Sequence, residues 1–298
     1  MGHRLTAHRA ETGPDQPIAT SMGPPPPPVM GPPPAERQSR KRLTHHSPRR
    51  GLPTLNVLWG THEAVLTGDV LLAQAYLVTS GLGKRARTRM SDTILALCEG
   101  QIAESCYRYK TDRPVDEYLK SVQGKTASLL SFSAWVGASC AGATADRADL
   151  LGAYGRDLGI TFQLTDDLLD IYSTVGEAGK VPGRDIAEGV YTLPVLVALD
   201  REPSLAELLT QPHGEEQMAQ LRRALNETGA AAAAIEMAYS FGEDARNHLA
   251  AAEPEGGAGS DMLAALVEKV LAPLSTLNTR RIADTSEQLS VRPLRDVS

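Results

Sequence analysis

The spacing of apolar residues is the feature that most restricts the fold of this chain. From about Leu52 onward, apolar residues recur at intervals of three and four, Ala and Leu dominate, and alternating patterns are almost absent. This spacing places apolar side chains on one face of an α-helix, whereas alternation would indicate strands. The sequence therefore predicts an all-α fold, with loops at 81–83, 174–184 and 253–260. The expected helices cover 55–80, 91–109, 114–143, 146–174, 189–200, 215–227, 230–252 and 261–274.

The start of the chain differs in composition from the rest. Residues 1–50 carry eight Lys and Arg against three Asp and Glu, whereas the remainder carries 22 against 33. Ten of the twenty prolines precede residue 35. A proline-rich segment with little apolar surface favours polyproline II and disorder. We interpret residues 1–48 as a disordered Pro/Arg-rich leader, 49–276 as one helical domain, and 277–298 as a polar C-terminal tail.

Composition argues against several classes of protein. A net charge of −6 and an aromatic content of 4% disfavour a nucleic-acid binder. The sequence has no apolar run long enough to cross a membrane and no apolar N-terminal stretch typical of a signal peptide. The three cysteines, Cys98, Cys106 and Cys140, lack metal-binding spacing and fit a reducing compartment. We therefore expect a cytoplasmic protein.

The clearest chemistry lies in residues 162–170, which read FQLTDDLLD. At about 100° per residue, Gln163, Asp166, Asp167 and Asp170 fall on one side of a helix. No Lys or Arg lies within four residues of these aspartates to relieve their mutual repulsion. Carboxylate oxygens suit Mg²⁺, which usually shares its coordination shell with a substrate phosphate. On this motif alone, a solvated acidic stripe is an equally open interpretation.

A glycine-rich loop with two cations follows this motif. Residues 179–189 read GKVPGRDIAEG, residues 191–196 read YTLPVL, and Lys180 can reach a phosphate near the carboxylates. Together these segments resemble the second aspartate-rich region of trans-isoprenyl diphosphate synthases, the polyprenyl synthetase family. The family pattern there is FQxxDDxxD, then GKxxGxD, then EGxxTLP. Further stretches resemble the family in the same order: RRGLPT at 49–54, AVLTGD and LLA within 64–73, EGQ at 99–101 and GKTA at 124–127.

The resemblance covers about residues 49–276 and implies a helical bundle of the isoprenoid synthase type around a central pocket. It implies Mg²⁺-dependent condensation of isopentenyl diphosphate with an allylic prenyl diphosphate, by a homodimer or a heterodimer with a family member. The implied metal ligands are Asp166, Asp167 and Asp170, and the implied catalytic residues are Asp166, Asp167 and Lys180. The implied substrate-binding residues are Arg49, Arg50, Lys125, Thr126, Gln163 and Lys180.

One family element is missing from the sequence. Family members carry a first DDxxD shortly before the Arg-Arg pair, where residues 40–44 here read RKRLT. We therefore expect an N-terminally truncated or divergent member without the early helices, and little activity from the chain as written. Three interpretations remain open: a polyprenyl diphosphate synthase, a non-catalytic partner or regulatory subunit of a heteromeric synthase, and a class I terpene cyclase. The second metal motif of cyclases, NDxxSxxxE, is not found.

Overall fold

The computed structural model describes residues 52–173, 183–210, 214–253 and 255–290, with side chains as far as Leu277. Within these residues the regular elements are helices and no strand occurs, so the expected all-α fold is confirmed. No helix in this part of the chain is both long and apolar enough to cross a bilayer. The predicted leader over 1–48 lies outside the described residues.

The chain divides into two compact units, Met1–Thr67 and Gly68–Ser298. The described part of the first unit holds the short helix α2 (Leu55–Leu58) and the beginning of α3 (Thr61–Ser80). The sequence predicted a single helix over 55–80, but the chain breaks between α2 and α3. Trp59 caps α2, and Gly60 has a φ of 105°. A left-handed residue cannot continue an α-helix, so α3 starts anew after it.

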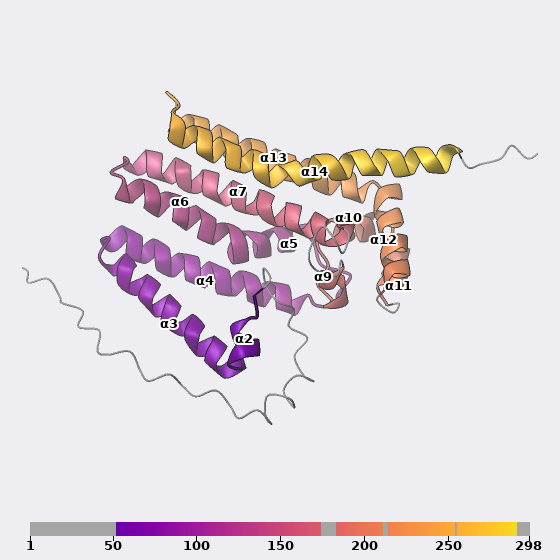
Figure 1. Ribbon diagram of the computed structural model, residues 1–298, viewed down its shortest axis with the longest axis horizontal. Helices are drawn as coiled ribbons and strands as arrows, with labels where there is room; N and C mark the ends of the chain where they lie inside the picture. Colours follow the sequence, from indigo (N-terminus) through magenta and orange to yellow (C-terminus); the bar gives the residue numbers. More distant parts are fainter. Residues whose placement is uncertain (1–51, 174–182, 211–213, 254, 291–298) are drawn as a thin grey trace, which may run out of the picture. The chain divides into compact units, whose positions relative to one another are not determined.

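The second unit consists of helices joined by short connections (Figure 1). Its elements are α4 (Lys84–Cys106), α5 (Val115–Val122), the π-helical turn η1 (Gln123–Ala127), α6 (Ser128–Cys140), α7 (Ala145–Tyr172), α9 (Arg184–Ala187), α10 (Leu193–Arg201), the 3-10 turn η2 (Pro203–Leu205), α11 (Ala206–Leu209), α12 (Glu215–Glu227), α13 (Ala230–Ala252) and α14 (Ala258–Ser290). The boundaries predicted for α12 and α13 are confirmed.

Other boundaries differ from the prediction. Helix α4 begins at Lys84, seven residues before the expected start at Ser91. Its first turn is basic and polar, so it carries no apolar periodicity that a sequence pattern could detect. Helix α10 begins at Leu193 with Pro194 in its first turn. The N–H groups of a first turn have no partner within the helix, so a proline, which has no N–H, loses no hydrogen bond there. Helix α14 continues beyond Leu274 to Ser290, with Pro273 inside it.

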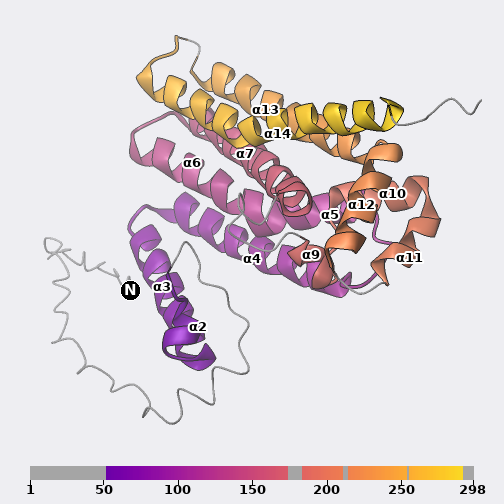
Figure 2. The same cartoon turned by 45° about the vertical axis from the view of Figure 1, so that its right-hand side comes forward.

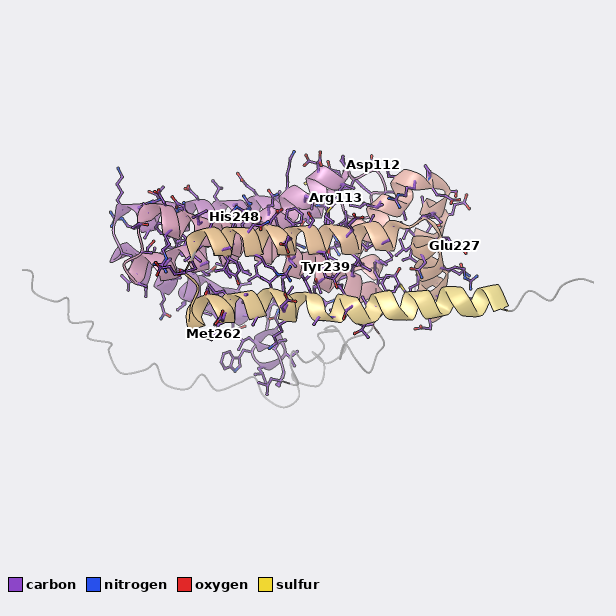
Figure 3. All side chains as sticks on the ribbon, turned by 90° about the horizontal axis from the view of Figure 1, so that it is seen from above. Asp112, Arg113, Glu227, Tyr239, His248 and Met262 are labelled. Carbon is purple, nitrogen blue, oxygen red and sulfur yellow. The ribbon has the colours of Figure 1, made fainter. Side chains whose placement is uncertain are left out.

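Helix α7 is the centre of the second unit. Every residue from Asp157 to Thr161 is buried, and consecutive residues of a helix point to all of its sides. Figures 1 and 2 show α6 along one side of α7 and the pair α13 and α14 along another. Figure 3 shows α13 and α14 running side by side. A helix covered on several sides is held firmly, so its last turns are a rigid base for a site.

Candidate active site

The aspartate-rich segment forms the last turns of α7, as its spacing predicted. Helix α7 is capped at its start by Thr144, whose hydroxyl accepts from the Arg147 backbone N–H at 3.3 Å, and it ends at Tyr172. The three aspartates differ in environment: Asp166 is exposed, Asp167 is 2% exposed, and Asp170 is half-buried. Adjacent helical residues point about 100° apart, so Asp166 and Asp167 face different surroundings.

The buried carboxylate of Asp167 accepts two hydrogen bonds. The Tyr118 hydroxyl, on α5, donates to Oδ2, and Gln163 Nε2 donates to Oδ1 at 2.7 Å. The Thr126 hydroxyl in turn donates to Gln163 Oε1 at 2.8 Å. Burial raises the pKa of Asp167 to about 6, although both donors and the charge of Lys125 lower it. The structure therefore brings together three of the predicted site residues, Thr126, Gln163 and Asp167.

Tyr118 is itself held by a buried arginine that lies in none of the motifs. Arg113, labelled in Figure 3, is 5% exposed, and its guanidinium lies 5.5 Å from the centre of the Tyr118 ring. It donates to Ser121 Oγ at 2.6 Å. Burial, followed by the negative charge of Asp167, raises the pKa of Tyr118, so this phenol stays protonated and donates to the carboxylate.

Lys125 forms an ion pair with Glu104 of α4. Both side chains are mostly buried, with exposures of 19% for Lys125 and 12% for Glu104. Gln101 Nε2 donates to the other carboxylate oxygen of Glu104 at 3.2 Å. Lys125 lies in the GKTA motif, whereas Glu104 lies in none of the motifs. The available signal was the EGQ element at 99–101, since Glu104 lies one helical turn beyond it.

Two facing glycines allow α4 and η1 to touch at this point. A Cβ added to Gly100 would lie 2.6 Å from the backbone nitrogen of Lys125 and 2.8 Å from the Ser121 carbonyl oxygen. A Cβ on Gly124 would lie 2.4 Å from the Ala96 carbonyl oxygen. Both distances are far inside van der Waals contact. The EGQ and GKTA elements therefore meet in space, and their glycines bring the Lys125 turn against α4.

The segment over 183–190 brings a further carboxylate to the end of α7. The Gly183 N–H donates to the Asp170 carbonyl oxygen at 2.8 Å, and the Asp185 N–H donates to Asp170 Oδ2 at 3.2 Å. Burial, together with the charges of Asp170 and Asp167, raises the pKa of Asp185 to about 7, while the charge of Lys125 opposes this increase. Asp185 is the final residue of the GKxxGxD pattern, which is the signal that could have identified it.

The donor set fits a hard divalent cation. Asp166, Asp170 and Asp185 offer only carboxylate oxygens, and the repulsion that raises the pKa of Asp185 is what a cation would offset. Among the described residues no three His, Cys, Asp or Glu side chains are already gathered in a metal-binding arrangement. The metal ligands predicted from the sequence therefore remain a prediction. Arg49, Arg50 and Lys180 lie outside the described residues, and their roles also stay predictions.

Comparison with known proteins identifies the family. Residues 45–228 match the family model described as polyprenyl synthetase. The chain belongs to the polyprenyl synthetase family. Among its relatives, a nonaprenyl diphosphate synthase of Mycobacterium tuberculosis is 37% identical over 207 residues, which are 68% of this chain and 62% of the relative. Heptaprenyl diphosphate synthase component 2 of Geobacillus stearothermophilus is 39% identical over 155 residues, 52% of this chain and 48% of its own length.

A solved family structure shares the fold. Geranylgeranyl pyrophosphate synthase from Corynebacterium glutamicum, complexed with calcium and isoprenyl diphosphate, is 31% identical with a TM-score of 0.64. The match covers 74% of this chain and 69% of that structure. The family resemblance drawn from the motifs is thus confirmed. The chain spans only 48% and 62% of the two curated polyprenyl synthetase relatives named above.

Proposed function

We propose that this chain is a polyprenyl diphosphate synthase, a prenyltransferase that condenses isopentenyl diphosphate with an allylic prenyl diphosphate. The observation that carries this proposal is the meeting of the end of α7 with the Lys125 turn and Asp185, in a chain of the polyprenyl synthetase family. An ammonium group, neutral donors and several carboxylates there could surround a metal-bound diphosphate. Breaking the allylic C–O bond requires stabilisation of the charge that develops on the departing diphosphate.

Each described site residue has a role in this proposal. Lys125 contacts the diphosphate of the allylic substrate, and the polar side chains of Thr126 and Gln163 contact the same substrate. Asp166 and Asp170 are the carboxylates that would hold Mg²⁺, whose bound charge stabilises a departing diphosphate. Asp167 belongs to the same motif, but its two oxygens are engaged by Tyr118 and Gln163. We therefore assign Asp167 mainly to fixing the orientation of Gln163.

We further propose that the chain works as a homodimer or as a heterodimer with a family member. In α3, Val70, Leu71, Leu72 and Leu77 are between 37% and 67% exposed, and the three consecutive residues among them point about 100° apart, in different directions around the helix. A helix that is apolar on all sides is normally buried. The name of the Geobacillus relative, component 2, describes that protein as one part of a larger synthase. This is consistent with pairing between family members.

A cytoplasmic location is proposed on the cysteines. Cys98, Cys106 and Cys140 are free and exposed. Exposed thiols of this kind are typical of a reducing compartment. The terpene cyclase alternative is not favoured, because the relatives named above are prenyl diphosphate synthases. The non-catalytic subunit is the competing outcome of the activity test.

The activity test compares the chain with a variant that carries an acidic DDxxD segment in place of residues 40–44. Both proteins are incubated with radiolabelled isopentenyl diphosphate, farnesyl diphosphate and Mg²⁺, and the extracted polyprenyl product is counted. We expect product from the variant and roughly 10²- to 10³-fold less from the unaltered chain, the usual loss when one preorganised electrostatic partner is missing.

Three further results test the proposed function against the alternative. Asp166→Asn in the acidic variant should abolish its product, because it removes an exposed carboxylate proposed as a metal ligand. No product from the acidic variant, although the protein binds inorganic diphosphate with Mg²⁺, would favour the non-catalytic subunit. Turnover by the unaltered chain within about tenfold of the variant would show that the first acidic motif is dispensable here.

A further inference from the structure

The segment over 183–190 is held at both of its ends. At the α7 end, Gly183 and Asp185 donate backbone hydrogen bonds to Asp170. At the other end, the connection between α4 and α5 supplies two residues. The Tyr109 N–H donates to the Gly189 carbonyl oxygen at 2.7 Å, and Arg108 donates to the Glu188 carbonyl oxygen through Nε at 3.0 Å and Nη2 at 2.7 Å.

Tyr109 adopts a conformation that its residue type disfavours. Its φ is 60°, and it is the one residue other than glycine with a positive φ in the described part of the chain. A bulky residue in this region is strained and stays there only when its surroundings require it. Burial of the ring does not hold Tyr109 in this conformation, since the residue is 65% exposed. Its contacts with the 183–190 segment do.

The Tyr109 ring also lies directly against Gly189. A Cβ added to Gly189 would lie 2.4 Å from Cδ1 of that ring, and Gly189 has a φ of 75°. Glycine is therefore needed here both for space and for conformation. The Arg108 guanidinium lies 6.0 Å from the centre of the Tyr109 ring, which keeps the two side chains together.

The two ends of the segment are connected through Asp185. The Val190 N–H donates to the Asp185 carbonyl oxygen at 2.8 Å, and the Asp185 N–H donates to Asp170. A displacement of Glu188 and Gly189 therefore moves Asp185 relative to the end of α7. The contact made by Arg108 and Tyr109 with Glu188 and Gly189 fixes where the Asp185 carboxylate lies.

We propose that Arg108 and Tyr109 are positioning residues for the diphosphate and metal site. Their role is indirect: they hold the 183–190 segment so that Asp185 stays beside Asp170. This inference rests on the proposed function, because it assumes that the site binds a metal-bound diphosphate. It predicts that binding of that ligand depends on residues of the α4–α5 connection.

The test measures binding of inorganic diphosphate in the presence of Mg²⁺ by isothermal titration calorimetry, using the full chain. Arg108→Ala removes both guanidinium hydrogen bonds and should weaken binding by roughly three- to thirtyfold, the usual range for indirect coupling. Arg87→Ala is the matched control, since Arg87 also donates to a backbone carbonyl, that of Ser80 at 3.0 Å. The control should bind as the unaltered chain does, and both variants should have similar melting temperatures.

A second pair of variants tests the contact itself. Gly189→Ala should weaken binding because its methyl group collides with the Tyr109 ring. Adding Tyr109→Gly removes that ring and should restore part of the affinity, which a general loss of stability would not do. If Gly189→Ala does not fold, Arg108→Ala still decides the question.

Two results would overturn the inference, and they are distinguishable. Normal binding by both Arg108→Ala and Gly189→Ala, with clear binding by the unaltered chain, would refute the positioning role and leave the proposed function standing. Absence of binding by the unaltered chain would refute the proposed function and this inference with it.

Discussion

The contact between Gly100 and η1 leads to a sharp prediction about stability. In Gly100→Ala the new methyl group would lie 2.6 Å from the Lys125 nitrogen and 2.8 Å from the Ser121 carbonyl oxygen. Both are backbone atoms of helical turns, so neither can rotate away as a side chain could. Helix α4 and η1 would have to separate by about 1 Å before the methyl group reached ordinary contact distance.

The expected loss of stability combines two opposing effects. Forcing an additional methyl group into a packed interface costs about 1–3 kcal/mol, and two rigid contacts place Gly100→Ala toward the upper part of that range. Alanine recovers up to about 1 kcal/mol because it favours the helix over glycine. The net destabilisation is about 1–2 kcal/mol, which lowers the melting temperature of a unit of this size by roughly 3–6 °C.

Gly137→Ala provides the matched control. Gly137 also lies inside a helix, α6, but a Cβ there would meet nothing within 4 Å. In this variant alanine favours the helix over glycine and meets no steric conflict. It should therefore be more stable to unfolding than the unaltered chain by up to about 1 kcal/mol. Thermal melting followed by circular dichroism, with urea denaturation as a second measure, compares the three proteins. If Gly100→Ala melts at or above the temperature of Gly137→Ala, the close approach is not a constraint and the reasoning fails.

Three further predictions concern charge, a buried hydrogen bond and surface. Glu104→Gln leaves Lys125 without its anionic partner and should tighten calorimetrically measured binding of inorganic diphosphate severalfold, most strongly at low salt; weaker binding would contradict this. Tyr118→Phe deprives the Asp167 carboxylate of a donor and should lower the urea-derived free energy of unfolding by about 1–3 kcal/mol, whereas an unchanged value would show that the bond is not important. Leu77→Glu should reduce self-association measured by light scattering, and a monomeric unaltered chain would refute the proposed interface.

The sequence predicted the fold best where apolar periodicity was bounded by glycine. Helices α12 and α13 follow Gly214 and Gly229, and their limits were predicted correctly. A glycine was not sufficient by itself, because Gly83 precedes α4 and Gly60 separates α2 from α3, and both of these helix starts were missed. The polar first turn of α4 could not be distinguished from a loop, and the break at Trp59 interrupts an otherwise continuous apolar pattern. The π-helical form of η1 depends on tertiary contact with α4, which has no local signature.

The site was predictable to the extent that it lies within short motifs. Thr126, Gln163 and Asp167, which the motifs selected, are joined by hydrogen bonds, and their roles stay predictions. Glu104 and Tyr118 were missed because their contacts join residues 21 and 49 positions apart, to Lys125 and Asp167 respectively. Spacing along one helix cannot reveal such partners, since they are brought together only when α4, α5 and α7 pack.

The different environments of Asp166 and Asp167 affect how variants of the motif would survive in a cell. Asp166 is exposed, so replacing it should leave the amount of folded protein unchanged and remove only what the chain does with its ligand. Asp167 is buried and accepts from two donors, so replacing it leaves the buried Tyr118 hydroxyl and the half-buried Gln163 amide without an acceptor and should lower cellular abundance. In a mutational library scored separately for abundance and for activity, substitutions of Asp166 should therefore lower activity alone. Substitutions of Asp167, the same residue type in the same motif, should lower abundance as well.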